Sequence, residues 1–526
     1  MRLKKFSCLG SALVLSFGIV SAIGFAGVAH AAPHLGAPYT CTWTGTGGNS
    51  NFSTAENWSG CNSAAPQPGD SDNLVFDNTS LTATATLNND IANLTVGNIE
   101  FTGSNTSYAD VLSGNTITIT GGVTDSTVDG YTGIANTLII SGNQTFSSAN
   151  QTNYQVLQGS GNITVTGGGI AAFDEPGNSQ TLSGYTGAIS STNSIIQLSA
   201  YGTFNDSGMV SVSGSATLDL FSNIYRGGTI TYDVPIELSG NGNNKWAALN
   251  LDGGQGNATT NTLSGAVTLN SDIQVTADQD NTLDITGLVS YNGYTINSVG
   301  AGVTTITVAS GDNESGENPI VGNNVTYVDD GTVGNTTVNS GGLLKGLGTV
   351  GNTNVESGGN VAPGHSPGCL TVDGNLTETG TYTADLDGTT ACTGYDQLDV
   401  TGAINLTGST LAPVIMSGFT PITGNSFELI DNQGSSPITG TFSYDGTNLT
   451  EGSTFTVNGI EFTITYKGDG GNNVVISVVN APKTPNTGLG LTKTYAWLPL
   501  LGGLVMASGV FFVSRRIGHS VATRQR

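Results

Sequence analysis

The amino-acid sequence predicts an all-β fold of the β-solenoid type, in which short strands stack coil upon coil. First, no sustained apolar i, i+3, i+4 pattern, as an amphipathic helix would show, occurs between Cys41 and Asn480. Second, short runs of alternating apolar and hydroxyl side chains end at glycine, of which the chain has 77. Third, the eleven-residue stretch that begins at Thr332 returns 17 residues later, at Thr349, with nine positions unchanged. Repeats this short are typical of stacked coils.

The chain begins with the pattern of a secretory signal peptide, which we assign to residues 1–31. Three basic residues precede an apolar region at about residues 11–28, and Ala29-His30-Ala31 is a small-residue cleavage site. Cys8 lies before the apolar region rather than at its end, which argues against a lipoprotein. We therefore expect the rest of the chain to be exported.

The expected exported body is strongly acidic. All 38 Asp and Glu residues lie between Glu56 and Asp469, and the bases in that range are Arg226, Lys245, Lys345 and Lys467. A surface of this charge repels phosphate backbones and anionic lipids. We therefore expect no nucleic-acid partner, and contact with a membrane only through the C-terminal helix described below.

Four cysteines lie in the expected exported body, and three pairings of them are possible. Their close spacing favours Cys41–Cys61 and Cys369–Cys392 as disulfides, each contributing around 3 kcal/mol in the loop-entropy account. No Cys-x-x-Cys occurs, and no histidine cluster accompanies the cysteines. We therefore expect neither a metal site nor a cofactor.

The body is expected to consist of an N-terminal cap, the solenoid and a less repetitive β-rich segment, at residues 32–80, 81–375 and 376–479. Runs such as residues 116–120 and 162–166 would turn Val and Ile inward, where each fully buried side chain contributes about 1.5–3 kcal/mol. Asn335 and Asn352, at matching turns of the repeat, would stack as an amide ladder. A string of immunoglobulin-like modules is the alternative, but each of these needs about 100 residues.

The last part of the chain predicts a linker and a membrane anchor. The linker covers residues 480–494, and a transmembrane helix with a basic tail covers residues 495–526. The uncharged run at residues 496–513 is close to the ~20 apolar residues that cross a bilayer. Arg515-Arg516 would keep the end of the chain in the cytoplasm.

The linker contains the pentapeptide Thr484-Pro485-Asn486-Thr487-Gly488. Followed by an apolar run and a basic tail, it resembles the LPxTG-like sorting signal of sortase substrates. The resemblance implies cleavage after Thr487 and its transfer to a cell-envelope amine, with a sortase as partner. Thr484 stands where the commonest pattern has Leu, which leaves the sortase class open. An uncleaved membrane anchor is the alternative.

Two groups of short motifs lie in the body. Near its beginning are Trp43-Thr44-Gly45, Asn57-Trp58 and Pro68-Gly69-Asp70, and toward its end are Pro363-Gly364-His365-Ser366-Pro367-Gly368 and Tyr395-Asp396-Gln397-Leu398. Together they resemble the passenger regions of autotransporters and related surface proteins with autotransporter-associated β-strand repeats. The resemblance implies a right-handed parallel β-helix. The sorting tail departs from that group, so self-translocation through an outer membrane is not implied.

No residue is assigned a catalytic role. Asp329-Asp330 could be read as the acid and base of a hydrolase, but neighbours on a strand point to opposite faces. His365 is interpreted as a turn residue.

The sequence therefore favours a non-catalytic adhesin, spacer or envelope component that touches a glycan or protein of a host or neighbouring cell. A wall-anchored polysaccharide lyase or hydrolase and a self-assembling envelope layer are the alternatives. An acidic groove containing Arg226 or Lys245 would favour the enzyme, and a face of Asn and Thr would argue against it.

Overall fold

The computed structural model describes residues 38–62, 65–128, 131–174, 184–200, 203–205, 208–222, 228–243, 246–253, 258–277, 281–300, 302–468 and 471–481. Over these ranges the chain is all-β, and the helical elements are two short 3-10 turns, η1 (Ala55–Asn57) and η2 (Asn78–Ser80). The predicted all-β class is thereby confirmed. The predicted signal peptide, the motif Thr484–Gly488 and the C-terminal helix lie outside the described residues. Within those residues, no helix has the length and hydropathy to cross a membrane.

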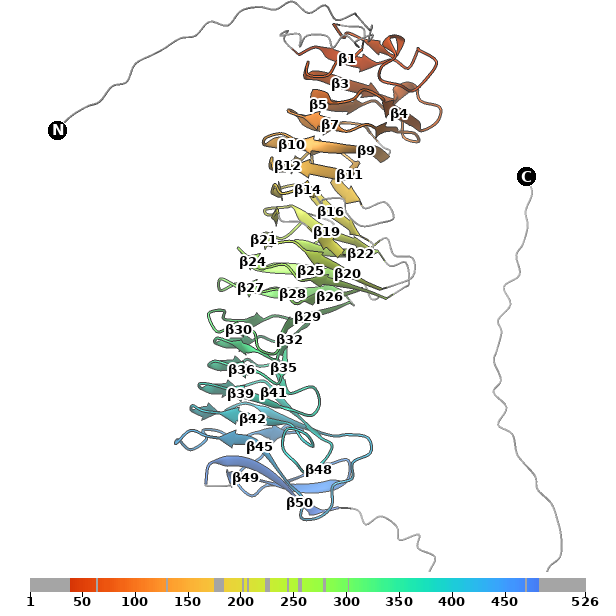
Figure 1. The fold of residues 1–526 in the computed structure, drawn as a ribbon. Helices are drawn as coiled ribbons and strands as arrows, with labels where there is room; N and C mark the ends of the chain where they lie inside the picture. Colours follow the sequence, from red (N-terminus) through yellow and green to blue (C-terminus); the bar gives the residue numbers. More distant parts are fainter. Residues whose placement is uncertain are drawn as a thin grey trace, which may run out of the picture. The chain divides into compact units, whose positions relative to one another are not determined.

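The strands build three sheets in which parallel pairing dominates, as expected for a fold of the β-solenoid class. In the middle of the chain, three consecutive strands make one coil, and each pairs with its counterpart in the next coil (Figure 1). One coil is β24 (Val267–Leu269), β25 (Ile273–Ala277) and β26 (Asn281–Ile285), and the next is β27 (Val289–Ser290), β28 (Ile296–Gly300) and β29 (Val303–Val308).

The 17-residue repeat of the sequence is one coil of the structure. Thr336 and Val338 of β34 (Thr336–Val338) pair in parallel with Thr353 and Val355 of β37 (Thr353–Val355). All four of these side chains are buried, whereas the residue between each pair faces outward. The alternation read from the sequence therefore places one apolar column inside the stack.

Asparagine side chains connect the coils at one corner, as predicted for Asn335 and Asn352. Oδ1 of Asn335 accepts the backbone N–H of Asn352 at 3.0 Å, and Oδ1 of Asn352 accepts that of Asn375 at 2.9 Å. The ladder is longer than predicted, because Asn318 and Asn375 continue it with bonds of 3.0 and 2.9 Å. Each Oδ1 thus satisfies a turn N–H of the following coil.

The N-terminal cap is continuous with the stack. Strand β1 (Thr40–Trp43) pairs in parallel with β3 (Asp72–Asp77), whose other neighbour is β5 (Leu94–Thr102). Beneath them lies an aromatic cluster in which the Phe76 ring stacks on Phe101 with centroids 5.5 Å apart. The disulfide between Cys41 and Cys61 ties this first layer together.

Parallel pairing continues past the boundary that the sequence placed at residues 375/376. Strand β40 (Leu376–Glu378) pairs in parallel with β37 and β43 (Ile404–Asn405). Beyond this boundary, the first strand that pairs antiparallel with another is β45 (Ser426–Asn432), whose partner is β50 (Asn473–Asn480). The coil length changes before this boundary: the Asn ladder steps 17 residues to Asn352, 23 residues from there to Asn375, and 28 residues beyond it. Longer loops obscure the repeat in the sequence while the ladder continues.

Candidate functional site

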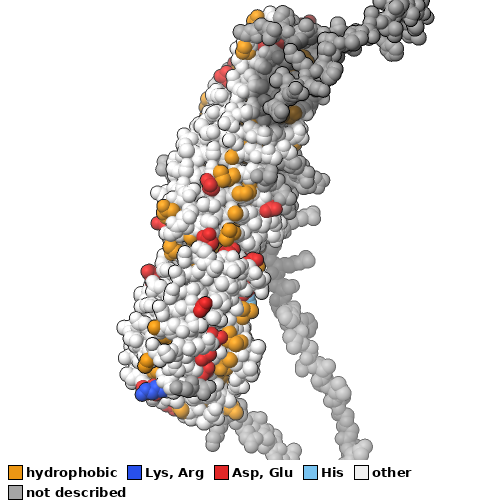
Figure 2. Space-filling view, turned by 60° about the vertical axis from the view of Figure 1, so that its left-hand side comes forward, with side chains coloured by type: hydrophobic (Ala, Val, Ile, Leu, Met, Phe, Trp, Pro, Cys, Tyr) orange, Lys and Arg blue, Asp and Glu red, His pale blue; other side chains and the backbone are white. Residues whose placement is uncertain are grey.

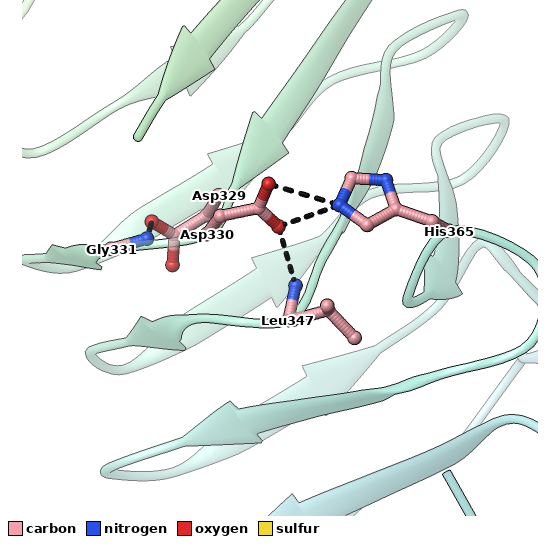
Figure 3. A network of polar contacts seen from close by, with 5 residues as sticks. All are labelled: Asp329, Asp330, Gly331, Leu347 and His365. Atoms are coloured by element: carbon pink, nitrogen blue, oxygen red, sulfur yellow. Dashed lines mark hydrogen bonds and ion pairs between the residues drawn. The ribbon is translucent and has the colours of Figure 1, made fainter. Parts of the chain in front are cut away.

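The turn Pro363–Gly368 brings together residues that the sequence singled out separately. It follows β38 (Asn360–Pro363), which is two coils beyond β32 (Val325–Asp329) in the same ladder. Nε2 of His365 lies 2.9 Å from both carboxylate oxygens of Asp330, which also accepts the Leu347 N–H at 3.0 Å (Figure 3). The His365 side chain is 48% exposed and Asp330 is 22% exposed. This pair is the one ion pair found among the described residues when His365 is protonated.

Asp329 turns to the other face of the strand. Its side chain is fully buried, and Oδ1 accepts the N–H of Gly331 at 3.1 Å, as Figure 3 also shows. Burial raises the pKa of Asp329 to about 6, and the neighbouring charge of Asp330 acts in the same direction. The two carboxyl groups therefore lie on opposite faces, as the strand alternation predicts, and they do not converge on one substrate.

Two glycines, Gly346 and Gly348, allow the close packing at Asp329. Gly346, the last residue of β35 (Leu343–Gly346), has a φ of +120°, and a Cβ at this position would overlap the Asp329 carbonyl oxygen. Only glycine fits both requirements. The backbone therefore brings Leu347 to Asp330 without an intervening side chain.

Ser366 and Asp396 hold the other side of the turn. Oγ of Ser366 is hydrogen-bonded to Oδ2 of Asp385, in β41 (Thr381–Leu386). The buried carboxylate of Asp396 accepts the N–H of Gly368 at 2.8 Å and that of Asp385 at 2.9 Å. Burial raises the pKa of Asp396 to about 7, although these two hydrogen bonds and, less strongly, the positive charge of Lys345 oppose the effect. Asp396 is therefore the residue that fastens the turn to the next coil.

This arrangement supports turn structure better than nucleophilic chemistry. A serine nucleophile needs a base such as imidazole within hydrogen-bonding distance of its hydroxyl group. Ser366 is instead hydrogen-bonded to Asp385, while the neighbouring His365 contacts Asp330. Sequence reasoning quoted Asp396 within a motif but missed its role, and it did not single out Asp385. Both residues could have been recognised in the sequence, because each places a carboxyl group beside a strand-like run that is otherwise apolar.

The second disulfide lies beside this turn. Cys369 opens β39 (Cys369–Val372), directly after the turn, and it is bonded to Cys392 in the loop that follows β41. Both cysteine pairs that the spacing favoured are thus bonded in the structure. Across the described ranges, no group of three or more His, Cys, Asp or Glu side chains is arranged to hold a metal ion.

A pocket of about 640 Å³ opens far along the chain from this turn. It lies where the loop before β6 (Asp110–Gly114) faces two turns, one from β10 (Gln144–Ser148) to β11 (Gln151–Gly159) and one from β12 (Ile163–Thr166) to β13 (Ile170–Asp174). The described residues that line it carry hydroxyl, amide and apolar groups, and none of them is titratable. Arg226 and Lys245, which would favour the enzyme alternative if they lay in an acidic groove, are outside the described residues.

Comparison with known proteins adds no assignment, since no family model and no curated sequence matches this chain.

Proposed function

We propose that this protein is exported, held at the bacterial cell surface and active without catalysis, as an adhesin, spacer or envelope component. The observation that supports the proposal is the chemistry of the outward strand positions. One parallel ladder aligns Thr145, Thr164, Ser190 and Ser211 on successive strands, all of them at least partly exposed. Figure 2 shows a face that is mostly neutral, with scattered carboxylates and small apolar patches. Such a face offers hydrogen bonds over a large area and few groups suited to acid–base chemistry.

The proposal includes a right-handed parallel β-helix and attachment by a sortase through Thr487. Two disulfides support the extracellular location, because such bonds persist in oxidising compartments. The acidic composition supports it as well, since 38 acidic residues against 13 basic ones keep an exposed protein soluble.

Surface attachment is tested by mass spectrometry of the cell-wall fraction. If a sortase acts, the C-terminal peptide of the wall-bound protein ends at Thr487 and is joined to an envelope amine. A Thr487→Ala variant should shift the protein from the wall to the membrane fraction, whereas Thr494→Ala, outside the motif, should leave it in the wall. Recovery of wall-bound peptides that continue past Gly488 would contradict sorting.

The non-catalytic role is tested with cells that make or lack the protein. We expect adhesion to host or neighbouring cells, or spacing of the envelope, to depend on the protein. Incubation of purified protein with wall and host polysaccharides should release no new reducing or unsaturated ends. Release of such ends would favour the lyase or hydrolase instead.

A further inference from the structure

The walls of the 640 Å³ pocket are held in place by hydrogen bonds from buried or half-buried asparagines. Asn105 Nδ2 donates to the Leu81 carbonyl at 2.7 Å, while its Oδ1 accepts the N–H groups of Ser107 and Tyr108 at 2.9 and 3.0 Å. Oδ1 of the buried Asn78 accepts the Asn105 N–H at 3.1 Å. The loop that carries Thr106, Ser107 and Ala109 is therefore fixed before any ligand binds, which lowers the entropy cost of binding.

The opposite wall is equally constrained. The N–H of Gly168 donates to Ser194 Oγ at 2.9 Å, and that of Gly169 donates to the Ser148 carbonyl at 2.8 Å. Nδ2 of Asn150 is hydrogen-bonded to the Thr127 carbonyl, so the orientation of this amide is also set. Both walls are thus fastened to neighbouring coils by hydrogen bonds.

The lining combines two kinds of group. Hydroxyl and amide side chains, which both donate and accept hydrogen bonds, come from Thr84, Thr106, Ser107, Asn150 and Gln151. Small apolar surfaces come from Ala109, Ala149, Ile170 and Ile195. The volume lies within the ~300–1,000 Å³ of small-molecule sites.

Charge narrows the choice of ligand. None of the described lining residues is charged. The surrounding body is acidic, so an anionic ligand is repelled. A cation finds no carboxylate among the lining residues. The lining therefore suits a neutral ligand that carries many hydroxyl groups and also has apolar C–H surfaces.

We propose that this pocket binds a neutral saccharide unit, and that it is the recognition site of the adhesin. The inference rests on the proposed adhesive function and gives it a ligand class and a place on the molecule. Hydroxyl groups of the sugar would pair with the Thr106, Ser107, Asn150 and Gln151 side chains, while its C–H faces would lie on Ala149 and Ile170.

The proposal is tested by titrating the protein, purified from the cells that make it, with neutral di- and trisaccharides. Sialylated and sulfated glycans serve as anionic counterparts, and binding is followed by saturation-transfer NMR and calorimetry. We expect at least one neutral saccharide to bind, with an affinity that changes little with salt because no ion pair forms.

Filling the pocket should abolish binding. Ala149→Trp places an indole at an exposed turn position of the lining, and we expect the affinity to fall at least about tenfold. Ser215→Trp is the matched control, since Ser215 is an exposed turn residue between β18 (Val210–Val212) and β19 (Thr217–Ser222), outside the pocket lining. If Ala149→Trp fails to fold, as judged by circular dichroism, Ser107→Tyr fills the pocket from the opposite wall.

Two outcomes would overturn the inference. The first is that only anionic glycans bind, or none does. The second is that a folded pocket variant binds the neutral saccharide as tightly as the unmodified protein. In either case, adhesion of intact cells is measured separately, so a failure of the saccharide site is distinguishable from a failure of the adhesive function itself.

Discussion

Carboxyl groups a single residue apart take opposite roles in this molecule, according to the strand face that carries them. Asp330 is partly exposed and pairs with His365, whereas Asp329 is buried. Asp396 is buried as well, but it accepts two backbone N–H groups and thereby joins two coils. Because a buried N–H without an acceptor is costly, these groups differ in their contribution to stability.

Removal of Asp396 should destabilise the protein far more than removal of Asp330. Asp396→Ala leaves the N–H groups of Gly368 and Asp385 without an acceptor, at a cost of about 2–5 kcal/mol. Asp330→Ala, the matched control, loses the exposed pair with His365, worth at most about 1 kcal/mol, and the acceptor of the Leu347 N–H, which water can replace because this hydrogen bond is exposed. Urea unfolding at pH 8, where the Asp396 carboxyl group is mostly ionised, measures both. Equal losses would contradict the assignment of Asp396 as the residue that fastens the turn.

At the scale of strands and turns, the repeat aligns equivalent residues of successive coils. A side chain that recurs at the same position of every coil meets its own counterpart, so one hydrogen bond is repeated along the stack. Asn352 makes three such bonds: its Oδ1 accepts from Asn375, its Nδ2 donates to Asn335 at 2.9 Å, and its N–H donates to the same oxygen. The ladder therefore sets the register where the strands themselves are short.

Loss of one ladder amide should weaken the stack locally. Asn352→Ala removes the acceptor of the Asn375 N–H and one amide bond, for which we expect about 1–2 kcal/mol. The control is Asn354→Ala, two residues further on, which replaces an exposed side chain on β37 and should change stability by less than about 0.5 kcal/mol. Hydrogen exchange of the Asn375 and Ala403 amides would localise the effect. If Asn352→Ala and Asn354→Ala were equally stable, the ladder would make no measurable contribution to stability.

The sequence predicted the strands, turns and contacts between coils only in part. The 17-residue coil and the inward columns followed from alternation and glycine spacing, because both are local properties of the chain. The full length of the Asn ladder and the continuation of parallel pairing past residue 376 did not follow, because coils of 23 and 28 residues carry inserted loops that conceal the period. The cysteine pairs were favoured by spacing and His365 was interpreted as a turn residue, but the contacts of this turn with Asp330, Asp385 and Asp396 were not foreseen.

For the molecule as a whole, acidic groups enclosed in the coils connect stability to pH. Glu378 is 1% exposed, and burial raises its pKa to about 8, with the Gly380 N–H offsetting only part of this effect. Burial likewise raises the pKa of Asp396 and Glu314 to about 7. The folded state therefore retains protons that the unfolded chain releases above its ordinary carboxyl pKa.

The protein should be most stable in mildly acidic solution, near about pH 5. Because these folded-state pKa values are raised, the stability they contribute is present below the unfolded pKa and is lost as pH rises through about 6 to 8. Below about pH 4 stability should fall again, since hydrogen bonds hold the pKa of Asp77 and Glu451 below its usual value. Urea unfolding between about pH 3 and 9 measures both sides of this maximum.

The variant Glu378→Gln isolates the largest single contribution to the pH dependence of stability. The stability of the unmodified protein relative to this variant should fall by on the order of 4 kcal/mol between pH 4 and 9. Glu356→Gln, at an exposed position, should follow the unmodified protein at every pH. A stability difference that does not change with pH would show that Glu378 does not titrate as its burial implies.

The sequence by itself determined the all-β class, the 17-residue coil and the side chains that face inward, because alternation and turn residues act over a few neighbouring positions. Only the tertiary structure decided which carboxyl groups are buried, how His365 meets Asp330 and where a neutral pocket opens. Those features join residues of different coils, and the lengths of the intervening loops decide which of them meet. The same local pattern is compatible with many such loop lengths, so contacts between coils become defined only when the stack is formed.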